Sequence, residues 1–323
     1  MLAPIALFVF ARPEHTRRTV DSLKQNYLAH QSELFIFSDA EKSEAQEELV
    51  CEVRQYIRQI EGFKSVTIVE RETNFGLANS IIEGVTSIVN KQGRVIVLED
   101  DLITSPYFLT YMNDALEKYS NDDRVASIHG YLLPCNKSLP DAFFLPGADC
   151  WGWATWRRGW EHFNPSGQSL LDNLKRGKLT HTFDYNGTAP FLKILEDQIE
   201  GRNNSWAIRW HTSVFLAGKL TLYPGRSLVH NIGHDSSGNH CGETSKYDTV
   251  ISEAPIDISN VVVEPSQQAL LAFEEFYRRE QTAYKRLIRS IFSLNLMKTL
   301  TATAKEWLPT AAFRLLRKML IGS

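Results

Sequence analysis

The chain has 323 residues, of which 43% are hydrophobic and 23% charged, with a formal net charge of −3. This size suits one large α/β domain or two modest ones, and the ordinary composition argues against a disordered chain. The small negative charge gives no reason to expect a nucleic-acid partner. Because the four cysteines form no C-x-x-C pair, we expect reduced thiols and a cytoplasmic protein. The apolar start is too short for a signal peptide, and no apolar run of about 18 residues predicts a membrane-spanning helix.

The first hundred residues alternate apolar runs with amphipathic segments. We predict strands over 4–10, 34–39, 65–70 and 94–98, and helices over 14–28, 43–60 and 79–90. Such alternation predicts an α/β fold with a mostly parallel, open sheet. Ligands of these sheets bind beyond the carboxyl ends of the strands. Asp39, the loop 71–76 and Glu99-Asp100-Asp101 should therefore converge on one rim.

The second half is more irregular. Residues 143–160 are dense in aromatics and glycine, and a polar loop is expected over 231–243. We predict a strand over 220–224 and helical segments over 170–197, 206–217 and 267–289. Residues 290–319 read as a broken amphipathic segment. Residues 281–323 carry eight cations and one acid, a net charge of +7, which indicates attraction to anionic surfaces.

The acidic run Glu99-Asp100-Asp101 directly follows an apolar strand. Three adjacent carboxylates repel one another, so a fold that gathers them needs a counter-charge. Oxygen ligands suit Mg²⁺ or Mn²⁺, and such a cation can neutralise a departing diphosphate. An exposed strand end with surface acids is the alternative. The chain has no P-loop, no G-x-G-x-x-G after the first strand and no G-x-S-x-G elbow, which argues against an NTPase, a dinucleotide enzyme and an α/β-hydrolase.

Several segments in this order resemble the GT-A glycosyltransferases, in particular the N-acetylglucosaminyltransferase I type and bacterial enzymes that build lipopolysaccharide or capsule. The resemblance covers roughly residues 3–242. It rests on Ala11-Arg12-Pro13, Phe37-Ser38-Asp39, Asn74-Phe75-Gly76-Leu77-Ala78, Val97-Leu98-Glu99-Asp100-Asp101 and the block from Pro146 to Trp156. It implies a GT-A catalytic domain over 1–265, with a nucleotide-sugar half (1–128) and an acceptor half (129–265), and a C-terminal amphipathic helical tail over 266–323.

The resemblance also implies a donor site. Arg12 would contact a phosphate or support the acidic cluster, and Asp39 would bind the nucleotide base, although a helix cap is its alternative role. Asn74 and Gly76 would form a loop over the sugar nucleotide, where Gly76 could equally be a simple turn residue. Arg71 would pair with the diphosphate, the alternative being a solvated surface arginine.

In the acidic run, the resemblance makes Asp101 the metal ligand and Asp100 a ribose contact, with Glu99 anchoring the turn. GT-A enzymes often add a late histidine on the metal or the diphosphate. We assign this role to His234, with His230 and His240 as alternatives.

The acceptor half would contribute aromatic and polar contacts. Aromatic faces stack on the apolar side of sugar rings. The residues proposed to bind substrate are Trp151, Gly152, Trp153, Trp206 and Arg209, with a core role as the alternative for the tryptophans.

The pattern lacks the carboxylate that commonly serves as catalytic base. Family members often place an aspartate just after a tryptophan, where this chain has Ala207. The proposed bases are Asp149 first, then Asp197, then Glu196, with structural pairing to arginine as the alternative. Because the usual base is absent, a retaining mechanism stays open.

Together these features predict a hexosyltransferase that moves a sugar from a nucleotide-sugar, such as a UDP-sugar, to a saccharide or lipid-linked acceptor in envelope polysaccharide synthesis. The basic tail would hold the enzyme peripherally on the inner face of the membrane; a packed helical pair is its alternative. The rival functions are a sugar-nucleotide nucleotidyltransferase and a non-catalytic saccharide-binding protein with a decayed site.

Overall fold

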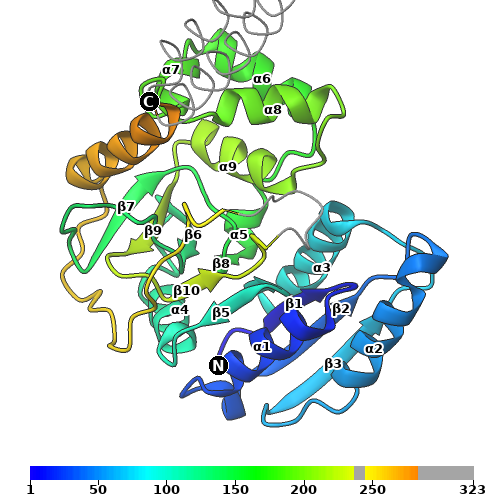
Figure 1. The fold of residues 1–323 in the computed structure, drawn as a ribbon. Helices are drawn as coiled ribbons and strands as arrows, with labels where there is room; N and C mark the ends of the chain where they lie inside the picture. The colour runs from blue at the N-terminus through cyan, green and yellow to red at the C-terminus, as the bar shows by residue number, and fades with distance from the viewer. Residues whose placement is uncertain (236–243, 283–323) are drawn as a thin grey trace, which may run out of the picture. The chain divides into compact units, whose positions relative to one another are not determined.

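The computed structural model describes residues 1–235 and 244–282 of the chain. The chain divides into two compact units, 1–274 and 275–323. The first unit contains an eight-stranded sheet of order β3-β2-β1-β4-β8-β6-β9-β7 (Figure 1). In the second unit the described residues, 275–282, are helical. The predicted amphipathic tail from 290 onwards lies outside the described residues, and the predicted boundary at 265/266 remains a prediction.

Four parallel strands form one half of the sheet. They are β1 (Ile5–Val9), β2 (Glu33–Ser38), β3 (Ser65–Glu70) and β4 (Arg94–Glu99). All four match predicted strands. Every residue of β1 is buried, which is typical of a central parallel strand covered on both faces.

Helices cover both faces of this half. The chain moves outward from β1 to β3 and then returns to β4, so right-handed crossovers put α1 (Pro13–Lys24) and α2 (Glu47–Ile57) on one face and α3 (Leu77–Gln92) on the other (Figure 1). Pro13 begins α1 at a position that needs no N–H donor, and Gly93 ends α3 at a φ of +79°. Two single-turn helices, Ala29–Gln31 and Glu44–Gln46, precede β2 and α2.

The other half of the sheet mixes directions. It contains β6 (Val125–His129), β7 (Ala142–Pro146), β8 (Trp153–Trp156) and β9 (Leu220–Pro224). Strand β8 runs antiparallel to both β4 and β6. The residues that precede β8 therefore lie at the rim formed by the carboxyl ends of β4 and β6. A small second sheet pairs β5 (Leu102–Thr104) with β10 (Val229–Asn231).

Four of the remaining helices, α6 to α9, confirm the helical segments predicted over 170–197 and 206–217, whereas α4 and α5 were not predicted. In chain order, these helices are α4 (Phe108–Lys118), α5 (Arg157–Trp160), α6 (Gly167–Arg176), α7 (Thr180–Phe183), α8 (Phe191–Ile199) and α9 (Trp206–Leu216). A further helix runs from 267 to 282. The side chains of Ser166 and Ser205 cap α6 and α9 by accepting backbone N–H bonds.

A tryptophan cluster joins α3, α5 and α9 to the sheet. The Trp153 ring lies 5.5–5.7 Å from those of Trp160, Trp206 and Trp210, and the four pack with Ile81 and Val85 of α3. The predicted class, an α/β protein with an open, mostly parallel sheet flanked by helices, is confirmed. None of the helices in residues 1–235 and 244–282 has the length and apolar character to cross a bilayer.

Candidate functional site

The turn after β4 brings two carboxylates beside the turn after β1. Asp100 and Asp101 are 4% and 9% exposed. Arg12 Nη2 pairs with Asp100 Oδ1 and lies 3.0 Å from Asp101 Oδ2. The counter-charge that the acidic run requires is therefore supplied in part by Arg12, in the supporting role predicted for it.

Asp100 ties this turn to its neighbours. Its Oδ2 accepts the Phe10 N–H at 3.2 Å, and its carbonyl accepts the Thr19 hydroxyl at 2.9 Å. Thr19 Oγ1 in turn accepts the Leu102 N–H at 3.1 Å. Both carboxylate oxygens of Asp100 thus have protein partners, and Asp100 anchors the turn, the role predicted for Glu99. The predicted ribose contact of Asp100 remains untested.

The charges of the cluster follow from its burial. Burial, together with the charges of Asp101 and Asp100, raises the pKa of Glu99 to about 8, against the opposing charge of Arg12. Burial also raises the pKa of Asp100. The two aspartates hold the pKa of Arg12 above its ordinary value although burial lowers it. Near neutral pH, Glu99 therefore retains its proton for most of the time.

This makes the stability of the protein depend on the Glu99 proton. Its folded pKa lies above the unfolded value of 4.5, so the folded state holds a proton that the unfolded state loses, and stability falls as pH rises from about 4.5 to 8. Glu99→Gln should be near wild type at pH 5 and more stable than wild type at pH 9, by a few kcal/mol at most. Urea unfolding in EDTA at the two pH values measures this difference, and equal ΔΔG at both would contradict the assignment.

Asp101 has a carboxylate oxygen that is free to bind a ligand. Its Oδ1 is buried and has no hydrogen-bond partner among residues 1–235 and 244–282. Its carbonyl accepts the Ile232 N–H at 2.8 Å, and a side chain at position 233 would collide with its Oδ2, so Gly233 is required there. The segment after β10 is thereby held against the acidic turn.

His234 is the residue after Gly233. Burial lowers its pKa while Asp101 raises it, and neither ring nitrogen has a partner in the described part of the chain. The neighbouring Asp235 lies 3.1 Å from His15 Nε2. Of the alternative histidines, His230 lies within β10, and His240 falls outside the described residues. The charge of Asp101 acts on His234, and the predicted metal contact of His234 remains a prediction.

An aromatic cluster adjoins His234. The Trp151 ring lies 4.7 Å from Tyr131, 5.3 Å from His234 and 5.4 Å from Tyr247. Tyr131 donates its hydroxyl to the Tyr247 carbonyl at 2.8 Å, which ties the rim after β6 to the late segment. Trp151 is only partly buried, so the predicted saccharide contact at Trp151 stays a proposal.

Three other residues predicted to contact substrate have structural roles in the fold. Trp153 is 0% and Trp206 3% exposed, both within the tryptophan cluster. Gly152 has a φ of +67°, and a side chain there would collide with Val229. Trp153 is the first residue of β8, whereas Trp151 lies in the bend before it, and the positive φ of Gly152 between them breaks the extended chain, so Trp151 is partly exposed while Trp153 is in the core.

Arg209 also has a structural role. It is 8% exposed and donates to the carbonyls of Ser205 (3.1 Å) and Pro165 (3.3 Å). Its third partner is the Asn204 side chain at 3.4 Å. The guanidinium thus fixes the entry into α9, and little of this side chain is exposed.

Substitution of Trp151 and of Trp153 should lower the free energy of unfolding by different amounts. Trp153→Ala is expected to lower the free energy of unfolding by about 3–5 kcal/mol, because it opens a cavity among four packed rings. Trp151→Ala should cost under about 1.5 kcal/mol. Urea denaturation of the pair tests this, and equal losses would place Trp151 in the core as well.

Asp149 lies at the same rim with an accessible carboxylate. Its side chain is 40% exposed, its Oδ1 accepts the Cys150 N–H at 2.8 Å, and its Oδ2 faces His129 Nε2 at 3.7 Å. Burial raises the pKa of the Cys150 thiol, and Asp149, Glu99 and Asp101 each add to the rise. Cys150 is therefore within electrostatic reach of both the predicted base and the acidic cluster.

Asp197 does not suit the role of base that was predicted for it. It lies in α8, its Oδ1 pairs with Lys193 and Arg202, and these hydrogen bonds lower its pKa. A carboxylate held in its charged form by two cations accepts a proton poorly. The alternative noted for it was structural pairing with Arg157 or Arg209; the structure shows such pairing, but with Lys193 and Arg202.

Asp39 organises the loop after β3. Its carboxylate accepts the N–H groups of Phe75 and Gly76, both at 2.8 Å, and of Ala40 at 3.0 Å. Asn74 donates to the Ala40 carbonyl, and Gly76 begins α3 with a φ of +72°. Asp39 therefore does not cap the following helix. The predicted base contact is untested, but these bonds place the loop predicted to cover the nucleotide directly beside Asp39.

Arg71 lies behind this loop. Its guanidinium stacks on the Phe75 ring at 4.4 Å and donates to Glu83 at 2.9 Å. The side chain is 12% exposed, so it is not a freely solvated arginine. Its predicted diphosphate contact remains a proposal.

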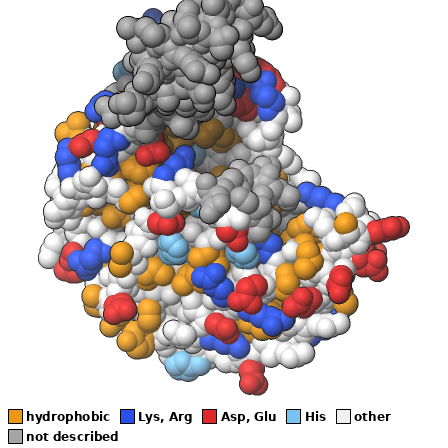
Figure 2. Space-filling model, in the orientation of Figure 1, with side chains coloured by type: hydrophobic (Ala, Val, Ile, Leu, Met, Phe, Trp, Pro, Cys, Tyr) orange, Lys and Arg blue, Asp and Glu red, His pale blue; other side chains and the backbone are white. Residues whose placement is uncertain are grey.

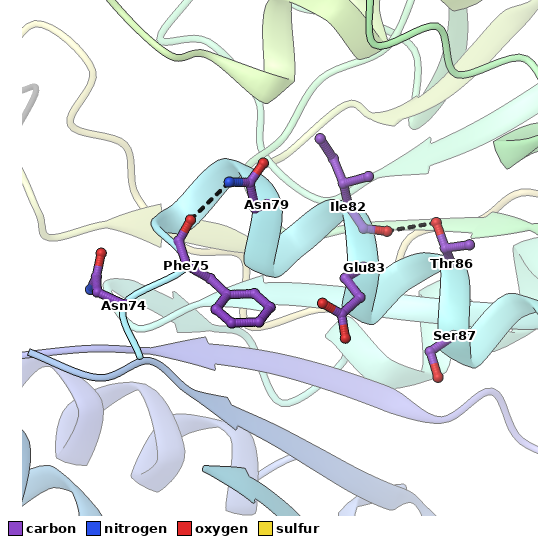
Figure 3. A pocket seen from close by; sticks show the side chains of 7 residues that line it. All are labelled: Asn74, Phe75, Asn79, Ile82, Glu83, Thr86 and Ser87. Atoms are coloured by element: carbon purple, nitrogen blue, oxygen red, sulfur yellow. Dashed lines mark hydrogen bonds between the residues drawn. The ribbon is translucent and has the colours of Figure 1, made fainter. Parts of the chain in front are cut away.

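A groove begins at this loop and follows α3. It has a volume of about 780 Å³, and Figure 3 shows its lining side chains coming from the loop and from one side of α3. A phenyl ring (Phe75), two amides (Asn74 and Asn79) and a carboxylate (Glu83) suit a sugar or nucleoside. None of its lining residues belongs to the acidic cluster, so we do not place the reaction centre in it.

The surface around the site has no single sign of charge. In the space-filling view, basic, acidic and histidine side chains alternate across the described part of this face, with apolar patches between them (Figure 2). The residues that sequence reasoning missed at the rim are His129, Tyr131, Cys150 and Tyr247. Of these, only His129 could have been singled out in the sequence, because it is a histidine at the end of an apolar run that begins at residue 125.

No protein-family model matches the chain, and no curated protein matches it. Among solved structures, it resembles a mannosyltransferase from Pyrobaculum calidifontis in complex with GDP-Man and Mn²⁺ (11% identity, TM-score 0.39, covering 68% of this chain and 70% of that one). It also resembles S. aureus TarS (12% identity, TM-score 0.32, covering 53% of this chain and 29% of that one). A third similar structure is a UDP-glucose pyrophosphorylase complexed with UDP-glucose (12% identity, TM-score 0.34, covering 69% of this chain and 90% of that one). TM-scores this low establish no shared function, so the site is assigned on its own geometry.

Proposed function

We propose that the chain is a metal-dependent glycosyltransferase that moves a sugar from a nucleotide-sugar, such as a UDP-sugar, to a saccharide acceptor. The observation that carries the proposal is the convergence of Arg12, Asp101 and His234 at the carboxyl ends of β1 and β4, with Asp149 at the same rim. That rim is where open α/β sheets bind their ligands.

The donor set fits a divalent cation. Asp101 Oδ1 is buried without a partner in the described residues, and His234 offers an unpartnered ring nitrogen close by. No group of three protein ligands occurs in residues 1–235 and 244–282. Mg²⁺ and Mn²⁺ sites of this class need few protein ligands, because substrate phosphates complete the coordination shell of the cation. When bound, the cation would neutralise the departing diphosphate.

The protein residues have separate tasks. Arg12 and Asp100 hold the acidic turn, and the loop tied to Asp39 would cover the nucleotide. Asp149 would take the proton of the acceptor hydroxyl, and Trp151 would present a ring face to the sugar. This arrangement favours an inverting reaction, in which a base activates the acceptor.

A panel of nucleotide-sugars with Mn²⁺ tests the function, scored by thermal shift and by slow donor hydrolysis. The proposal expects a shift and hydrolysis with one nucleotide-sugar, both abolished by EDTA. A metal-independent response, or exchange of pyrophosphate into the nucleotide-sugar, would favour the nucleotidyltransferase instead.

The acceptor is proposed from the basic C-terminal residues, which lie outside the described part of the chain. Their charge suits an anionic bilayer surface, where the lipid-linked acceptors of polysaccharide and lipopolysaccharide synthesis reside. Deletion of 290–323 should move the protein from membrane to soluble fractions, and retention without these residues would contradict peripheral binding.

A further inference from the structure

His129, the last residue of β6, is a fully buried imidazole. It is 0% exposed, and neither ring nitrogen has a hydrogen-bond partner among the described residues. An apolar side chain would fill this place without leaving polar atoms unpaired. Buried polar groups without partners are rare in native proteins and call for an explanation.

The ring is held by its neighbours. Tyr223 of β9 and Tyr131 approach it edge-on, with centroids 5.0 and 6.2 Å away. The carboxylate that faces His129 is Asp149, whose Oδ2 lies 3.7 Å from Nε2. Burial lowers the pKa of His129, and the charge of Asp149 opposes this. The imidazole is therefore neutral near pH 7 and can carry its proton on Nε2.

Asp149 is thus approached from two sides and open on a third. The Cys150 N–H holds Oδ1, His129 faces Oδ2, and 40% of the side chain is exposed at the rim. His211 of α9 contacts the segment that carries Asp149, but through its Nδ1, which is 2.6 Å from the Ala148 carbonyl and not directed at the carboxylate. Tyr185 also senses the charge of Asp149, which adds to the burial that raises its pKa.

We propose that His129 is a positioning residue, whose Nε2–H donates to Asp149 Oδ2 and fixes the carboxylate for its work as a base. The inference rests on the proposed function and names the residue that orients its base. The present 3.7 Å separation would shorten on substrate binding, as such contacts commonly do.

The proposed step balances without any proton from His129. The acceptor O–H bond breaks and its proton passes to Asp149, while the acceptor oxygen forms a bond to the anomeric carbon. The bond from that carbon to the diphosphate breaks, and its electron pair leaves with the diphosphate. His129 keeps its own proton and holds the carboxylate in place.

The first test needs no activity. The ring resonance of His129, identified by its loss in His129→Gln, is titrated by NMR in wild type and in Asp149→Asn. Because the Asp149 charge raises the pKa of His129, that pKa should fall in Asp149→Asn and stay unchanged in the matched control Asp197→Asn. An unchanged value in Asp149→Asn would overturn the inference whether or not the protein transfers sugar.

The second test separates positioning from packing. His129→Phe keeps the ring volume but removes the donor, and His129→Gln keeps an N–H donor. We expect kcat to fall about 10- to 100-fold in His129→Phe and less in His129→Gln, with the donor KM within twofold of wild type. His162→Gln, at a histidine away from Asp149, should match wild type. Full kcat in His129→Phe would overturn the inference.

Discussion

Replacing Asp101 by asparagine is expected to abolish the Mn²⁺-dependent thermal shift and to lower donor turnover by at least about 100-fold. Asp101 is the carboxylate in the cluster with a buried oxygen that has no partner in the described residues, whereas both oxygens of Asp100 are bonded within the protein. Asparagine keeps the shape but removes the charge that a cation needs. Thermal shift and hydrolysis assays, each with Mn²⁺ and with EDTA, measure both effects.

The control for this change is Asp197→Asn, which also removes one acidic charge but at an ion-paired position in α8. It should leave the Mn²⁺ response and donor turnover unchanged. A full Mn²⁺ response in Asp101→Asn would show that the cation binds elsewhere, and the assignment of the reaction centre would fail.

Asp149→Asn is expected to reduce sugar transfer by about 10²- to 10⁴-fold, the usual contribution of a general base. Donor and Mn²⁺ binding should persist, since the carboxylate does not belong to the acidic turn. Steady-state kinetics with the donor found by the panel, together with donor binding, separates the two effects.

Asp197 is the other candidate for the base, and its substitution distinguishes it from Asp149. Asp197→Asn should keep transfer within twofold of wild type, because its carboxylate already accepts from Lys193 and Arg202. Loss of transfer in Asp197→Asn with activity intact in Asp149→Asn would reverse the assignment.

In the parallel half of the sheet, β1 and β4 were predictable from sequence because they are buried and read as continuous apolar runs, and the edge strand β3 because apolar and polar residues alternate along it. The rim followed from topology alone, since polar residues directly after such strands must meet at one edge. Residues 102–142 received no assignment. They contain the helix α4 and the short strands β5 and β6. A short apolar run has the same pattern in a buried strand as in a buried helix, so these elements could not be told apart.

The aromatic block shows why the acceptor side was harder to predict. Trp151 and Trp153 are equivalent by composition, and only the position of β8 in the sheet decides which one faces the core. Asp149 and Asp197 are likewise alike in sequence, but tertiary pairing with Lys193 and Arg202 separates them. The contact of His129 with Asp149 joins segments 20 residues apart across two strands, which no local pattern records.

Equilibrium binding of UDP and of nucleotide-sugars by calorimetry, with Mn²⁺ and then with EDTA, tests most directly whether the rim beside Arg12 and Asp101 is a nucleotide-sugar site. We expect wild type to bind one of these ligands at least about tenfold more tightly with Mn²⁺, and Asp101→Asn to lose this difference. Binding that neither EDTA nor Asp101→Asn alters, or no binding by any ligand of the panel, would contradict the proposed site.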